Sequence, residues 1–271
     1  MREANLPIGV FDSGMGGLTV LAALRQQLPT EDFIYLGDTA RLPYGTKSAV
    51  TVQRYAHQAA SALVNRGIKA LVVACNTASA TALDSLARVF APLPVFGVVE
   101  PGALAASSAA DASGVTVLAT ESTIAGGAYQ RSLLRRQPTL RVLGRACPLW
   151  VTLAEQGSHP EVLSDAILLD GVSGLVRSAT QSHLPSTLVL GCTHFPVFRS
   201  RLQELLGEGV QVIDSAQTTA ATVASTLAAQ SLVSECGGKT LFLATDDALR
   251  FQRVGEIFLG EGLPDVELVD I

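Results

Sequence analysis

Residues 71–77 read LVVACNT, and residues 188–194 read LVLGCTH. Each stretch is an apolar run of strand length that leads to a small residue, a cysteine and two polar residues. Between such runs lie Ala-rich amphipathic stretches, and this alternation is typical of βαβ units that form a parallel sheet. Because the two stretches match, they predict an α/β protein with two related lobes and one equivalent cysteine in each.

The order of the apolar runs gives a division of the chain into lobes. Strands are predicted at residues 8–11, 33–36, 70–74 and 95–99, then at 115–119, 140–145 and 187–190, and finally at 210–213 and 241–244. We expect residues 1–97 and 209–271 to form the first lobe and residues 98–208 the second. Each lobe should be a mainly parallel sheet flanked by helices, with the active site in the cleft between the two lobes.

Composition excludes several classes of protein. The 271 residues have a formal net charge of -5, and the basic residues are scattered, so we expect no nucleic-acid partner. No apolar run approaches the roughly 20 residues that cross a bilayer, so we expect no membrane association. The N-terminal residues lack the apolar core of a secretory signal. These features predict a cytoplasmic protein.

The chain has four widely spaced cysteines, Cys75, Cys147, Cys192 and Cys236. This spacing is not that of a disulfide framework, and a reducing compartment keeps such residues as thiols. A free cysteine most often acts as a small buried apolar residue, and that interpretation holds for Cys147 and Cys236. Cys75 and Cys192 differ because each directly follows a predicted strand.

The placement of these two cysteines predicts a chemistry. In open α/β sheets, ligands bind beyond the carboxyl ends of the strands. We expect Cys75 and Cys192 to lie there, each immediately before a helix whose N-terminal amides lower the thiol pKa from about 8.5. A thiolate acts as a base and a thiol as an acid. Two such groups on opposite faces of one carbon atom can invert a stereocentre.

Two neighbouring residues are candidate helpers. Asp12 ends the first strand and should reach the same edge as Cys75, although an Asp before Ser-Gly is often only a turn or capping residue. His194 lies two residues after Cys192, although a lone histidine is more often structural. Cys192 and His194 without a second pair of ligands make a weak metal site, so we expect no metal.

The glycine-rich turn at residues 14–17 does not indicate a nucleotide. It lacks the Lys-Ser/Thr ending of a P-loop and the spacing of the dinucleotide fingerprint. Glycines at this position let backbone amides approach a small anion such as a carboxylate.

Seven motifs, in order and spread over nearly the whole chain, resemble those of bacterial glutamate racemases. They are residues 9–20 (GVFDSGMGGLTV), 37–45 (GDTARLPYG), 74–78 (ACNTA), 97–102 (GVVEPG), 147–151 (CPLWV), 191–196 (GCTHFP) and 213–215 (IDS). One motif alone would mean little, but the set is specific.

The resemblance implies roles for individual residues. Cys75 and Cys192 match the two catalytic acid/base thiols, Asp12 and His194 match their assisting residues, and Glu155 matches a carboxylate on the side of the second cysteine. Asp38 matches a further acidic position with a smaller or structural role. The implied substrate-binding residues are Asp12, Ser13, Tyr44, Gly45, Asn76, Thr77, Thr120, Thr123, Thr193 and His194.

The resemblance also implies how the protein works in the cell. The family needs neither pyridoxal phosphate nor a metal, and it supplies D-glutamate for peptidoglycan in the bacterial cytoplasm. The expected partner is therefore the small molecule glutamate. Oligomeric state varies in the family, so a homo-oligomer is possible.

Other functions stay open at this point. An aspartate or hydantoin racemase of the same superfamily would keep both thiols, whereas an arylmalonate decarboxylase would need only one. A non-catalytic binding or regulatory protein on the same scaffold would be expected to lose a thiol. A thiol hydrolase would use a Cys–His pair on a carbonyl, and a redox enzyme would want a C-x-x-C motif, which is absent from the sequence.

Overall fold

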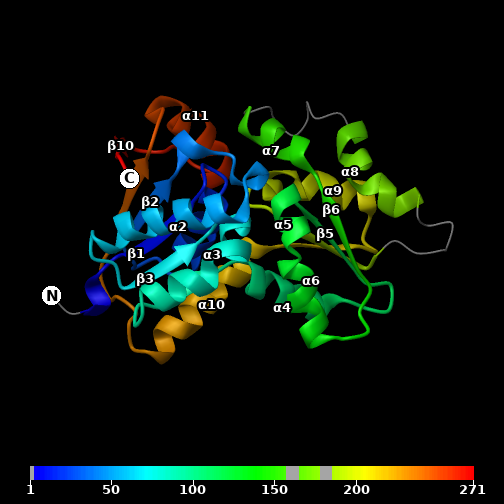
Figure 1. The fold of residues 1–271 in the computed structure, drawn as a ribbon, viewed down its shortest axis with the longest axis horizontal. Helices are drawn as coiled ribbons and strands as arrows, with labels where there is room; N and C mark the ends of the chain where they lie inside the picture. Colours follow the sequence, from blue (N-terminus) through cyan, green and yellow to red (C-terminus); the bar gives the residue numbers. More distant parts are fainter. Residues whose placement is uncertain (1–2, 157–164, 178–184) are drawn as a thin grey trace.

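A computed structural model describes residues 3–156, 165–177 and 185–271. It has two bodies side by side, each built on a parallel sheet with helices on both faces (Figure 1). The predicted fold class is confirmed.

The first sheet has six strands. In spatial order they are β10 (Val266–Leu268), β9 (Thr240–Ala244), β2 (Phe33–Gly37), β1 (Ile8–Asp12), β3 (Ala70–Val73) and β4 (Val95–Gly97). One face is covered by α2 (Ala49–Val64) and α3 (Asn76–Val89), and the other by α1 (Leu18–Gln27), α10 (Ser215–Ala229) and α11 (Ala248–Leu259). Both faces are covered, and β1, β2 and β3 are buried throughout, as is typical of parallel sheets.

The second sheet has four strands in the order β6 (Val142–Ala146), β5 (Val115–Ala119), β7 (Thr187–Gly191) and β8 (Gln211–Asp214). One face packs on α4 (Val99–Ala109) and α6 (Ala128–Arg136). The other packs on α7 (Pro148–Glu155), α8 (Asp165–Arg177) and α9 (Arg199–Leu206). The short helix α5 (Glu121–Gly126) follows β5. The described residues also form short 3-10 turns at Glu3–Asn5, Thr39–Arg41, Tyr44–Thr46 and Phe195–Phe198.

Alternate residues of a strand enter different cores, because successive side chains point to opposite faces of a sheet. In β1, Val10 belongs to the core beneath α1 and α10, whereas Phe11 belongs to the core beneath α2 and α3. The core that contains Val10 continues into the second lobe, where it includes Leu118 and Leu190. The two lobes therefore share apolar packing.

Two predictions about the strands need correction, and one strand was missed. The strand near residues 210–213 was expected to return to the first sheet, but β8 pairs with β7 in the second sheet, so the return follows Asp214. The strand at residues 95–99 is shorter than predicted, because α4 already begins at Val99; its Pro101 lies in the first turn, where no amide donor is needed. The edge strand β10 was not predicted.

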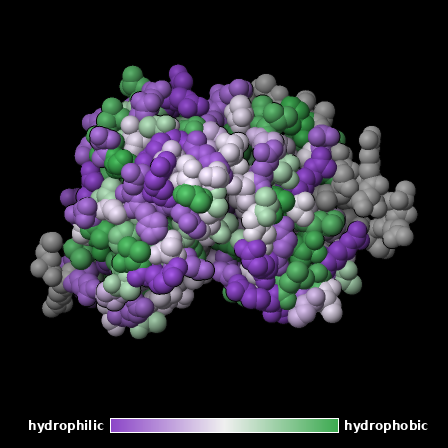
Figure 2. Space-filling view, viewed as in Figure 1, coloured by the Kyte–Doolittle hydropathy of each residue, from purple (hydrophilic) through white to green (hydrophobic). Residues whose placement is uncertain are grey.

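The outer surface is mixed. On the face shown in Figure 2, hydrophilic and hydrophobic residues are interspersed over both bodies. Among the helices that the structure describes, none has the length and apolarity needed to cross a bilayer.

Candidate active site

The two lobes meet at a narrow cavity that contains both predicted cysteines. Its lining includes Cys75 from the first lobe and Cys192 from the second. It also includes Ser13, Leu42, Pro43, Tyr44, Gly45, Asn76, Thr77, Thr120, Val151, Glu155, Thr193 and His194. The cavity holds only about 20 Å³, room for about one water molecule. Of the predicted site residues, Asp12 and Thr123 lie just behind this lining.

The lining comes from the carboxyl ends of neighbouring parallel strands. β1 ends at Asp12, and β3 ends two residues before Cys75. In the second sheet, β5 ends just before Thr120 and β7 just before Cys192. Carboxyl ends of parallel strands open at the same edge of a sheet. The cavity therefore lies where these two edges face each other.

Cys75 occupies the N-cap position of α3 and is 5% exposed. Its Sγ donates a hydrogen bond to Ser13 Oγ at 3.4 Å. Burial, with the charge of Asp12 adding to it, raises the pKa of Cys75 to about 12. The expectation that helix amides lower the pKa of this thiol is wrong, because the loss of hydration outweighs the amide contacts. At neutral pH, Cys75 is a protonated thiol.

Cys192 is not followed directly by an α-helix. The next regular element is the 3-10 turn Phe195–Phe198, so the predicted helix N-terminus at this cysteine is wrong. Its Sγ lies 3.7 Å from His194 Nδ1 instead. A protonated imidazole beside a sulfur stabilises negative charge there. The two cysteines therefore have different surroundings: a buried hydroxyl for Cys75 and a histidine for Cys192.

His194 is buried between Cys192 and Glu155. Its Nε2 lies 2.9 Å from Glu155 Oε1. Burial lowers the pKa of His194, but Cys192 and Glu155 together raise it more, to about 10. For Glu155, burial raises the pKa, but His194 and Arg250 lower it below its usual range. An imidazolium at neutral pH is therefore held between a carboxylate and a sulfur.

Asp12 is fully buried and is held by first-lobe and second-lobe donors. Its Oδ2 accepts from the Gly14 amide at 2.9 Å, and its Oδ1 accepts from Thr193 Oγ1 at 3.4 Å. Burial raises the pKa of Asp12 against the opposing effects of His194 and the backbone amides. After burial, the charge of Asp12 is the second cause of the raised pKa of Cys75.

Hydroxyls from the two lobes touch across the cavity wall. Thr77 Oγ1 lies 3.0 Å from Thr120 Oγ1 and 3.2 Å from Thr123 Oγ1. Gly45 packs against Thr120, since a Cβ on Gly45 would come within 2.7 Å of Thr120 Cβ. Three hydroxyls and a close backbone contact therefore form one inter-lobe group.

Two further side chains on the first-lobe side of the cavity, Asn76 and Tyr44, are fixed by hydrogen bonds. Asn76 Oδ1 accepts from Tyr129 OH at 2.7 Å, while Asn76 Nδ2 is buried and has no hydrogen-bond partner among the residues that the structure describes. Tyr44 OH donates to the buried Asp38, whose Oδ1 also accepts from Thr245 Oγ1 at 3.0 Å. Asp38 therefore holds Tyr44 by a hydrogen bond. The smaller or structural role that the resemblance implies for Asp38 stays a prediction.

Sequence reasoning missed Tyr129, Arg250 and Phe258. Tyr129 reaches Asn76 from α6. Arg250 Nη2 lies 3.5 Å from Glu155 Oε2, and the ring of Phe258 meets that of His194 edge-on, with centroids 5.2 Å apart. One signal was available for Arg250. A cation in the first turn of a helix opposes the helix dipole, so a partner for it can be expected.

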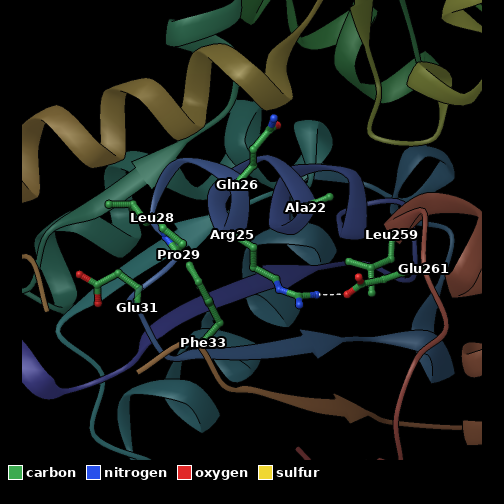
Figure 3. Close-up of a pocket in the computed structure, with 10 residues that line it drawn as sticks. Ala22, Arg25, Gln26, Leu28, Pro29, Glu31, Phe33, Leu259 and Glu261 are labelled. Atoms are coloured by element: carbon green, nitrogen blue, oxygen red, sulfur yellow. Dashed lines mark hydrogen bonds and ion pairs between the residues drawn. The ribbon is translucent and has the colours of Figure 1, made fainter. Parts of the chain in front are cut away.

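A second hollow, drawn in Figure 3, is lined by residues of the first lobe and has a volume of about 340 Å³. It is lined by residues of α1 and the following turn together with the end of α11, and the ion pair between Arg25 and Glu261 spans it. Glu31, the buried charge in this lining, is already paired with Lys69. This hollow has no cysteine in its lining.

Among the described residues, no group of three or more His, Cys, Asp or Glu side chains is placed to hold a metal ion. The expectation that the site needs neither a metal nor pyridoxal phosphate stays a prediction.

Each sheet contributes one free cysteine to the cavity, at the edge that faces the other sheet. This arrangement is that of a class of racemase, and sequence comparison assigns the chain to the same class. A sequence model described as Asp/Glu/Hydantoin racemase matches residues 8–223, so the chain belongs to that family. The glutamate racemase of Geobacter metallireducens is 46% identical over 267 residues, which cover 97% of this chain and 96% of that relative.

Solved glutamate racemase structures share the fold over nearly the whole chain. The Francisella tularensis enzyme in complex with D-glutamate superposes with a TM-score of 0.90 at 34% identity, covering 98% of each chain. The Thermus thermophilus enzyme in complex with beta-chloro-D-alanine gives a TM-score of 0.86 at 42% identity, covering 100% of this chain and 99% of that one.

Proposed function

We propose that this chain is a glutamate racemase, an isomerase that interconverts L- and D-glutamate with Cys75 and Cys192 as its two acid/base groups. The observation that carries the proposal is that both cysteines, one from each lobe, line a single cavity. Full-length relatives named glutamate racemase, at 46% and 41% identity, support glutamate over aspartate as the substrate.

The surroundings of the cysteines suggest how the proton moves. Cys192, as a thiolate beside the His194 imidazolium, removes the α-proton, and the Cα–H bond breaks. Cys75, as a thiol, donates its proton to the opposite face of the carbanion, and a new Cα–H bond forms. Cys192 ends as a thiol and Cys75 as a thiolate. The reverse reaction exchanges the two roles, and no electrons are gained or lost.

Binding of glutamate requires groups that match its charges. The buried Nδ2 of Asn76 has no partner in the described part of the chain, and a buried donor left unpaired is costly. We assign a substrate carboxylate as its acceptor. Hydroxyls and amides of Ser13, Thr77, Thr120, Thr123 and Thr193 supply further donors, and Asp12, Tyr44, Gly45 and His194 complete the binding set.

The size of the cavity adds a requirement for motion. Its volume of about 20 Å³ holds about one water molecule, whereas glutamate has many more atoms. The lobes must therefore separate to admit the substrate. Closure afterwards excludes water and strengthens the electrostatic contacts around the reacting carbon.

Two consequences concern the cell. The product D-glutamate would serve peptidoglycan synthesis, and the reaction would run in the bacterial cytoplasm, where thiols stay reduced. The possible homo-oligomer stays a prediction.

The test uses single substitutions of the two thiols. Cys75→Ala and Cys192→Ala should each lower the racemisation rate by several orders of magnitude, measured by circular dichroism with L- and D-glutamate. Cys147→Ala is the matched control, because this buried cysteine is absent from the cavity lining, and it should keep most of the activity. Full activity in either cavity variant would refute the proposal. Faster racemisation of aspartate than of glutamate would reassign the substrate.

A further inference from the structure

The C-terminal helix α11 belongs to the first lobe but contacts Glu155 and His194, a hydrogen-bonded pair in the second lobe. Arg250 Nη2 lies 3.5 Å from Glu155 Oε2, and the Phe258 ring packs edge-on against the His194 imidazole at an interplanar angle of 75°. Glu155 ends α7, and His194 follows β7. The same helix therefore contacts both partners of the pair from the other lobe.

The contact of Arg250 completes a chain of polar groups. Glu155 uses Oε1 for His194 Nε2 at 2.9 Å and Oε2 for Arg250. The other ring nitrogen of His194, Nδ1, faces Cys192 Sγ at 3.7 Å. Partners on both oxygens fix the rotation of the carboxylate, and the carboxylate in turn fixes the imidazole plane. The chain runs from Arg250 through Glu155 and His194 to the sulfur.

The position of Arg250 within α11 is unfavourable for the helix itself. It is the third residue of the helix, and its amide donates to the Asp247 side chain that caps the N-terminus. Cations at this end oppose the helix dipole. The side chain is nevertheless directed to Glu155, which is 8% exposed. A buried carboxylate that also contacts an imidazolium is a partner that offsets this cost.

We propose that Arg250 is a positioning residue for the racemase reaction: it holds the Glu155 carboxylate across the lobe interface, and thereby orients His194 beside Cys192. The inference rests on the proposed function. Since Arg250 and Glu155 belong to different lobes, separation of the lobes breaks their contact. The acid/base group on the Cys192 side is therefore complete only when the lobes are closed.

The experiment compares Arg250→Gln with Arg250→Lys, and uses Arg253→Gln on the exposed side of the same helix as the matched control. The kcat and KM for glutamate are measured for each. Arg250→Gln should lower kcat about fivefold, the upper range for one partly exposed ion pair, and change KM less than about twofold. Arg250→Lys should recover at least half of the lost kcat, and Arg253→Gln should match the wild type.

A double substitution separates positioning from a structural role. If Arg250 acts through Glu155, the variant with both Arg250→Gln and Glu155→Gln should have the same kcat as Glu155→Gln alone. Multiplied effects of the two changes would overturn the inference, and so would an Arg250→Gln variant that behaves like Arg253→Gln. A wild-type protein that does not racemise glutamate would instead refute the proposed function. Circular dichroism of each variant confirms that it is folded.

Discussion

The backbone of Gly16 in the first lobe lies directly against the His194 imidazole of the second. A Cβ built on Gly16 would overlap His194 Nδ1 and come within 2.6 Å of Thr193 Oγ1. This nitrogen is the one that faces Cys192. A glycine at position 16 is therefore required for the imidazole to stay in place when the lobes are closed.

We predict that Gly16→Ala lowers kcat about 100-fold, because a displacement of a catalytic group by about 1 Å has an effect of that size. The φ angle of Gly16 is not among the positive values, so alanine should leave the local backbone intact. The control is Gly126→Ala, where a Cβ would meet no described atom within 4 Å apart from its chain neighbours and the backbone of its own helix. An active Gly16→Ala variant would show that His194 needs no fixed position.

The pH profile should report on the contact between Glu155 and His194. Glu155 is one of the two groups that raise the pKa of His194 to about 10. Glu155→Gln removes that negative charge, so the pKa of His194 falls and the imidazolium loses its proton at lower pH. The basic limb of kcat/KM, which reports on the free enzyme, should move to lower pH. An unmoved basic limb would show that His194 does not control it.

Stability should depend on the buried pair of Lys69 and Glu31. Both side chains are fully buried, and Glu31 Oε1 also accepts from the Ser234 amide at 2.8 Å. Lys69→Met leaves the Glu31 carboxylate buried without its cation, which should lower the free energy of unfolding by about 3–5 kcal/mol. Urea denaturation at pH 7 measures it.

The control for that variant is Arg25→Met, which breaks the exposed pair with Glu261 seen in Figure 3. It should cost less than about 1 kcal/mol, since exposed ion pairs contribute little. Equal losses in the two variants would contradict the special cost of leaving a buried charge unpaired.

Local patterns predicted the strands β1 to β9 because most of them are short apolar runs with a clear end, whereas β10, with the sequence VEL, gave no such run. The position of Cys75 followed directly from this, since the residues after neighbouring strands meet at one edge of a sheet. The partner sheet of β8 could not be predicted in the same way. Its residues, Gln211–Asp214, suit the edge of either sheet, and only packing around them decides which.

Burial depth and long-range contacts could also not be predicted from local sequence patterns. Cys75 occupies the N-cap position of a helix as expected, but its 5% exposure determines its pKa, and no local pattern gives that exposure. Arg250 reaches Glu155 only because the fold brings the start of α11 in one lobe near the end of α7 in the other. The sequence of α11 gave no partner for its arginine.

The most direct test of the central claim is isotope incorporation from heavy water. The protein is incubated with L-glutamate in deuterium oxide, and both enantiomers are recovered early in the reaction. Two thiols on opposite faces predict that the D-glutamate formed has deuterium at Cα, while the remaining L-glutamate still has protium. D-Glutamate that keeps protium, or L-glutamate that exchanges as fast as product forms, would contradict the two-thiol account.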